Sequence, residues 1–273
     1  MIKRTASAAL RATLVAFVIA FPALVLPGVK PDSVQIVALV SLVAALLTFV
    51  EYWTDYPSFI EFRSAPPLNR MRFLALFSTV VLLTLICREQ MAPAGFESDL
   101  SGFGDVVGAA MDFPFSPVRL MVLVAQDDAM AAHLRVTAGL AYTISLIALL
   151  TFVAVVRLLD WPIRNGAFNV WVNLPLFDPT AGGDVLRRLK RDSHVNVALG
   201  FLLPFLVPAV LQLVSTTGMP VRLNDPQTLI WVVTVWAFIP SSLIMRGVAL
   251  MRIADLIEEK RRRAYAQAEL LVA

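Results

Sequence analysis

Apolar residues in this sequence are gathered into six long runs, and most of the runs are bounded by charged residues at both ends. No run contains a charge inside it. A membrane-spanning helix needs roughly 20 predominantly apolar residues, with about 17 to 25 allowed. The pattern therefore predicts an all-α integral membrane protein with six transmembrane helices. The predicted spans are Ala12–Val29, Val34–Val50, Phe73–Cys87, Val136–Val156, Val195–Val214 and Leu229–Met245.

The composition agrees with this class. Hydrophobic residues make up 58% of the chain and charged residues only 16%, whereas soluble domains are about 45–50% apolar and about 25% charged. The chain has too few polar residues to form a water-soluble protein by itself. A soluble enzyme and a disordered chain are therefore excluded.

Basic residues are unequally shared between the connections. Eighteen of the 23 lysines and arginines fall in the N-terminal segment, in the second and fourth connections, and after the sixth span. Because basic residues collect on the cytoplasmic side, both termini are predicted to be cytoplasmic, in the inner membrane of a bacterium. The first run resembles a signal peptide, but no small-x-small cleavage site follows it, so we expect it to remain as an anchor.

The connection of residues 88–135 is the longest on the predicted outer side and is acidic. We expect it to be a solvated cap, with the binding of a hard cation such as Ca²⁺ as the alternative. Inside it, the run Val118–Ala125 is too short to span a membrane. Ser116 and Pro117 precede this run and are typical of a helix start, so the run is predicted to be part of an interfacial or extramembrane helix.

Two cytoplasmic connections contain segments with the character of extended chain. Phe59–Arg63 lies between prolines, which prevent a continuous helix, and Phe168–Leu174 alternates in residue character with a period of two. We expect the two segments to pair as a small sheet, or else to lie along a protein partner. The candidate docking residues, including two from the C-terminal segment, are Phe59, Phe62, Arg63, Arg70, Trp171, Arg261 and Arg262.

Two more segments on this side are predicted to be helical. Asp184–His194 reads as a short basic helix with Asp184 as its N-cap, and it is expected to contact the anionic inner leaflet rather than nucleic acid. Residues 246–273 contain no proline and have apolar residues at helical spacing, so the sixth span is expected to continue as a cytoplasmic helix. The lipid-contacting residues of the basic helix are Arg187, Arg188, Lys190 and Arg191.

The sequence contains few residues that are candidates for catalysis or metal binding. Charges inside a membrane commonly mark ion or substrate pathways, and the predicted spans contain none. His133 and His194 fall on opposite sides, roughly 30 Å apart by the hydrocarbon thickness, and Cys87 is the one cysteine. Since no nucleophile or metal-binding motif is present, no catalytic activity, metal or cofactor is predicted.

Prolines are the conspicuous feature within the spans. Each is expected to kink its helix and to free a backbone carbonyl that a neighbour must satisfy. The predicted kinks are Pro22, Pro27, Pro204, Pro208 and Pro240.

Taken together, these features predict a non-catalytic accessory, assembly or scaffolding subunit of a larger membrane complex. The alternative is a permease or channel-like component for a small or lipidic solute, using the kinked first, fifth and sixth helices, because broken helices form binding sites in transporters. A third interpretation is a membrane-embedded lipid-modifying enzyme with Glu51, Glu61 or Asp160 near the headgroups.

Overall fold

The structure is a computed structural model that describes residues 2–56, 58–91, 99–162, 168–177, 184–217 and 222–272. In these ranges the chain forms helices joined by turns and irregular segments, and it forms no strand. The helices are α1 (Ile2–Val25), α2 (Pro31–Trp53), α3 (Leu68–Gln90), α4 (Asp99–Met111), α5 (Pro117–Val122), α6 (Asp128–Leu158), α7 (Val170–Asn173), α8 (Val185–Thr216) and α9 (Pro226–Val272).

Six of these helices are long and apolar enough to cross a membrane, which confirms that part of the prediction: α1, α2, α3, α6, α8 and α9. Each begins earlier than its apolar run, because the polar residues before the run also adopt helical backbone. The expected continuation of the sixth span is present, since α9 contains 47 residues. At about 1.5 Å per residue, α9 is roughly 70 Å long.

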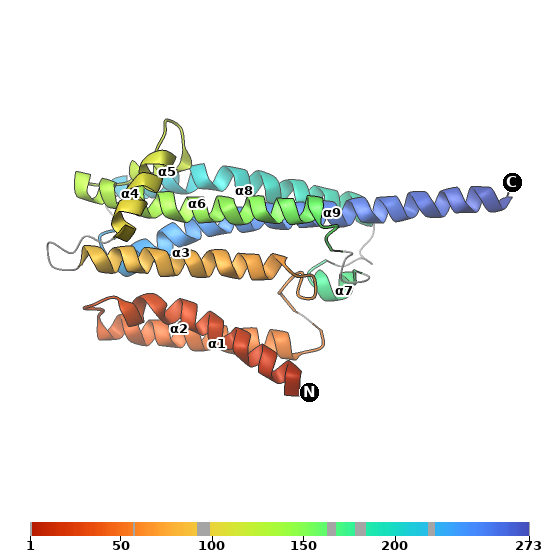
Figure 1. Ribbon diagram of the computed structural model, residues 1–273, viewed down its shortest axis with the longest axis horizontal. Coiled ribbons are helices and arrows are strands. Elements are labelled where there is room, and N and C mark those ends of the chain that lie inside the picture. The colour runs from red at the N-terminus through yellow and green to blue at the C-terminus, as the bar shows by residue number, and fades with distance from the viewer. Residues whose placement is uncertain are drawn as a thin grey trace.

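The main body of the bundle consists of α3, α6, α8 and α9, and α8 lies beside α9 (Figure 1). A hairpin of α1 and α2 contacts this body through α3 and, to a smaller extent, α9. Only 6% of the apolar window of α2 is buried within the protein. The two termini lie toward the same end of the bundle (Figure 1), which we call the terminal end.

Small residues bring two pairs of helices close together. A Cβ atom on Gly139 of α6 would lie 2.6 Å from the Cα of Gly108 of α4, so the two backbones touch. A Cβ atom on Gly247 of α9 would lie 2.8 Å from the carbonyl oxygen of Ser193 in α8. The Ser193 hydroxyl also donates a hydrogen bond to the Gly247 carbonyl (2.7 Å). Small residues and serine hydroxyls at helix contacts are typical of membrane bundles.

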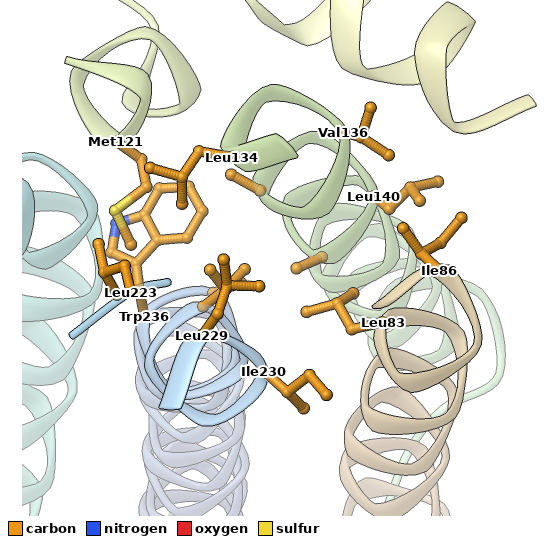
Figure 2. Packing of buried hydrophobic residues seen from close by; sticks show 14 of the residues in the cluster. Leu83, Ile86, Met121, Leu134, Val136, Leu140, Leu223, Leu229, Ile230 and Trp236 are labelled. Atoms are coloured by element: carbon orange, nitrogen blue, oxygen red, sulfur yellow. The ribbon is translucent and has the colours of Figure 1, made fainter. Parts of the chain in front are cut away.

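The opposite end of the bundle has its own apolar core. Figure 2 shows Ile86 of α3, Leu134 of α6 and Trp236 of α9 in this core, with Met121 of α5 beside Leu134 and Trp236. The predicted start of α5 is confirmed, because the Ser116 hydroxyl accepts a hydrogen bond from the backbone N–H of Arg119 (2.9 Å).

Asp105, Asp127 and Asp128 of the acidic connection are exposed, as expected for a solvated cap, but one carboxylate of this connection is not. The Asp112 side chain is buried and pairs with Arg119 (2.9 Å) and Arg135 (2.7 Å). Helix α4, which the sequence did not predict, packs on α6 through the glycine contact described above. Among the described residues, no group of three or more histidine, cysteine, aspartate or glutamate side chains could hold a metal ion. A cation site built from this connection therefore has no support in those residues.

Candidate docking face

The loop after α2 is folded tightly around one buried carboxylate at the terminal end. Glu51 is 2% exposed, and its Oε1 accepts hydrogen bonds from the backbone N–H groups of Ser58 (2.8 Å), Phe59 (3.1 Å) and Ile60 (2.9 Å). The Arg63 guanidinium donates in return to the carbonyl of Glu51 and to those of Thr54 and Asp55. The bond to the Glu51 carbonyl satisfies one of the last carbonyls of α2, which a helix end leaves unpaired, and the other two bonds hold the turn that follows the helix.

The two segments predicted to pair do touch, but not as a sheet. The backbone N–H of Phe62 donates to the carbonyl of Asn173 (2.6 Å). Both the N–H and the hydroxyl of Ser64 donate to Asn173 Oδ1, each at 3.0 Å. The prediction of extended strands is wrong, because Asn173 ends the short helix α7 and its side chain, rather than a ladder of backbone bonds, joins the segments.

An ion pair links this loop to α9. Arg246 binds Glu61 through two parallel hydrogen bonds of 2.5 and 2.7 Å, and the Glu61 side chain is 8% exposed. Arg72 of α3 lies within electrostatic reach of both groups and donates to the Ser242 carbonyl (2.7 Å). The loop, α3 and α9 are therefore joined by two arginines around a single carboxylate.

The apolar core below this loop includes one of the predicted docking residues. Phe62 is 1% exposed and lies against the rings of Trp161 and Phe168. The Trp161 indole also packs edge-on against Phe152 of α6. Phe62 is thus a core residue that a partner could reach only if the loop unfolded, and this corrects its place among the exposed candidates.

The other docking candidates in the connections fall into three groups. Phe59 is 48% exposed and Arg70 is exposed, so both are open to a partner. Arg63 is engaged with the end of α2, and burial lowers its pKa from the usual arginine value. The side chain of Trp171 lies outside the described residues.

The basic segment 184–194 is not a separate surface helix. It is the beginning of α8 and continues into the fifth span, with Asp184 as the predicted N-cap. Two of the four basic side chains contact neighbouring elements: Arg188 lies over the ring of Phe177, and Lys190 pairs with Glu258 of α9 (2.7 Å). Arg187 and Arg191 are exposed, and Arg191 pairs with the adjacent Asp192 (3.3 Å).

The extension predicted for the sixth span is the last part of α9, and its contacts with the rest of the bundle end near Arg261. Arg261 binds Asp184 (2.9 Å), and this hydrogen bond, followed by one from the Leu186 N–H, lowers the pKa of Asp184 below its usual value. Arg262 and the residues that follow it, up to 269, are exposed. Both arginines proposed for docking are therefore exposed, and Arg261 is already paired with Asp184.

The five prolines predicted to kink the spans do not all lie inside helices. Four lie inside helices, namely Pro22, Pro204, Pro208 and Pro240, whereas Pro27 lies beyond the end of α1 and so does not interrupt it.

One freed carbonyl has the expected partner. A proline removes the N–H that would bond four residues back, so Pro208 frees the carbonyl of Pro204. The indole N–H of Trp236 in α9 donates to that oxygen (3.0 Å). This carbonyl is therefore satisfied inside the bundle and is not presented to a solute.

Several contacts at the terminal end lay beyond reasoning from the sequence. Glu51 and Glu61 were considered only as candidate enzyme residues, yet both are occupied by structural hydrogen bonds.

The close contact of α4 with α6, at the opposite end of the bundle, did have a sequence signal. Gly104 and Gly108 are four residues apart, a spacing typical of tightly packed membrane helices.

The terminal end thus presents a hydrogen-bonded loop beside a helix that extends past the bundle. Comparisons with protein-family models, with curated proteins and with solved structures give no match to this chain.

Proposed function

We propose that this protein is a non-catalytic accessory, assembly or scaffolding subunit of a larger membrane complex. In this proposal the protein lies in the inner membrane of a bacterium with both termini in the cytoplasm. The terminal end, with Phe59, Arg70 and the exposed part of α9, is the surface that holds the partner.

The observation on which this proposal depends is the course of α9. After the ion pairs of Glu258 and Arg261 with α8, the helix continues through exposed residues as far as 269. Tyr265 is 69% exposed there. Within the described residues this segment packs against no other element after Arg261, and a partner that lies along it would bury its exposed side chains. The competing interpretation is a solvated tail without a partner.

The alternatives have less support from the same geometry. The carbonyl freed by Pro208 is bound by Trp236, so the proline feature that suggested a permease does not provide an open binding group at that point. Glu51 and Glu61 are engaged by backbone N–H groups and by Arg246. This leaves neither carboxylate free for the acid–base step of a lipid-modifying enzyme. The third candidate, Asp160, has a side chain that is 90% exposed and lies 3.8 Å from Arg252.

The test is purification from native membranes in mild detergent through a tag on the N-terminus, with particle mass and co-purifying chains measured together. We expect a stoichiometric set of other subunits with the full chain. Removing residues 264–273 should release that set, because it deletes exposed helix and leaves the Arg261–Asp184 pair intact. Tyr265→Ala should weaken the association in the same direction.

The matched control is Phe115→Ala at the opposite end of the bundle. Phe115 is 90% exposed, so this change also removes an exposed aromatic ring, and the complex should survive it. A wild-type particle that contains one kind of chain, or a complex that is unaffected by the truncation, would count against docking through α9.

A further inference from the structure

Large apolar side chains are exposed at the end of the bundle away from the termini. They are Phe103 and Val106 of α4, with Phe113 and Phe115 of the segment that joins α4 to α5, and we call these four the apolar set. Phe115 has a φ of 65°, in the left-handed region that a bulky side chain rarely adopts. Where large apolar side chains gather on one exposed segment, that segment is a candidate for contact with a protein or a membrane.

The packing of α4 fixes its level along the spanning helix α6. A Cβ atom on Gly104 would lie 2.7 Å from Val136 and 3.4 Å from Leu140, and both belong to the apolar run that begins after Arg135. At about 1.5 Å per residue, Leu140 lies roughly 7–8 Å past Arg135 along the α6 axis. Interfacial helices bury their apolar face about 5–10 Å into the boundary between headgroups and acyl chains. Helix α4 therefore lies level with this boundary and not above the membrane.

The two flanks of α4 differ in the way that an interfacial helix requires. Successive residues of a helix are turned by about 100°, so with Gly104 facing α6, Asp105 and Phe103 lie on opposite flanks. Both residues are exposed. Helix α4 crosses the beginning of α6 instead of running along it (Figure 1). A helix that crosses in this way turns one flank toward water and the other toward the membrane interior, and the charged and aromatic flanks suit these two surroundings.

Two arginines share one carboxylate beside the apolar set. Asp112, which directly precedes Phe113, pairs with Arg119 (2.9 Å) and Arg135 (2.7 Å). The Asp112 side chain is 4% exposed, whereas each arginine side chain is 40% exposed. One positive charge of this cluster is left uncompensated. Because a planar guanidinium has five N–H donors and matches phosphate in geometry, the exposed N–H groups can bind an anion that reaches them from the membrane surface.

We propose that α4 and residues 112–119 lie in the membrane leaflet at this end of the bundle. The apolar set lies among the acyl chains, and Arg119 and Arg135 bind the phosphate of an anionic phospholipid. The uncompensated charge beside exposed apolar side chains favours a lipid over a second protein chain, because a phospholipid joins an anion to apolar tails. This surface is independent of the proposed docking role at the terminal end.

The first test measures depth in nanodiscs made of phosphatidylglycerol and phosphatidylcholine. A nitroxide label is placed at Phe103→Cys or at Asp105→Cys in a Cys87→Ser background, and its collision rates with oxygen and with a water-soluble nickel complex are compared. Oxygen should be favoured at position 103 and nickel at position 105. The proposal is overturned by a label at 103 that nickel reaches as readily as it reaches 105, or by one that neither reagent reaches because protein covers it.

The second test measures the binding of phosphatidylglycerol to the purified full chain by native mass spectrometry, and its wild-type arm needs no variant. The wild type should retain phospholipid through purification. Arg119→Gln should weaken binding about 10-fold or more, the effect of one lost hydrogen bond to a charged group, while Arg135 still pairs with Asp112. Arg88→Gln, at an exposed arginine of the same end of the bundle, is the matched control and should bind as the wild type does. A wild type without bound phospholipid, or equal affinity in the two variants, would refute the phosphate site.

Discussion

The hydrogen bond from Trp236 to the Pro204 carbonyl gives a direct test of how the bundle tolerates its prolines. Trp236 is 1% exposed, and its indole N–H is the donor to an oxygen that Pro208 leaves without its helical partner. Trp236→Phe keeps an aromatic ring in place but removes this donor. Leaving a buried carbonyl unpaired costs about 1–3 kcal/mol, so the free energy of unfolding should fall by at least that amount, because the smaller ring also leaves a cavity.

A second substitution should restore the stability that Trp236→Phe loses. Pro208→Ala restores a backbone N–H that a regular helix donates to the carbonyl four residues back. In the Trp236→Phe background this N–H should recover about 1 kcal/mol. In the wild-type background it should add little, because the oxygen already has a donor. The two changes are therefore expected to be coupled rather than additive.

The assay is reversible unfolding in mixed micelles, with the free energy of unfolding compared across the wild type, both single variants and the double variant. Trp231→Phe is the control, because it makes the same chemical change at a half-buried position of the same helix. Strictly additive effects, or an equal loss in Trp231→Phe, would refute the assignment of this bond to the freed carbonyl.

Three further predictions concern other contacts. Glu61→Gln should destabilise the protein by about 3 kcal/mol, because the partly buried Arg246 loses its counter-charge; a midpoint of unfolding equal to that of the wild type would contradict this. Gly139→Ala should cost about 1–3 kcal/mol through overpacking against α4, whereas Gly102→Ala, with open space around it, should be tolerated in the same thermal assay. The lowered pKa of Asp184 means that its contribution to stability is present above its ordinary pKa and is lost as pH falls through the lowered pKa. The unfolding midpoint of the wild type should therefore drop more steeply below about pH 4 than that of Asp184→Asn.

Reasoning from the sequence determined the helical class, the number of spans and several helix ends. The six spans follow from the cost of exposing backbone and charge to lipid, which forces apolar helices of a set length. The start of α5 at Ser116, the N-cap Asp184 and the continuation of α9 follow from equally local rules, since each depends on neighbours within one or two turns.

Only the tertiary structure decided which polar groups meet. Glu61 and Arg246 are 185 residues apart in the chain, and nothing in local spacing pairs them. Asn173 joins the two segments that were predicted to be extended, because its side chain accepts two hydrogen bonds from Ser64, which lies 109 residues away in the chain. The contact of Cys87 with His133 likewise arises where two helix ends converge. Such contacts depend on packing between distant helices, and the sequence pattern of each helix specifies its apolar face but not the partner that this face meets.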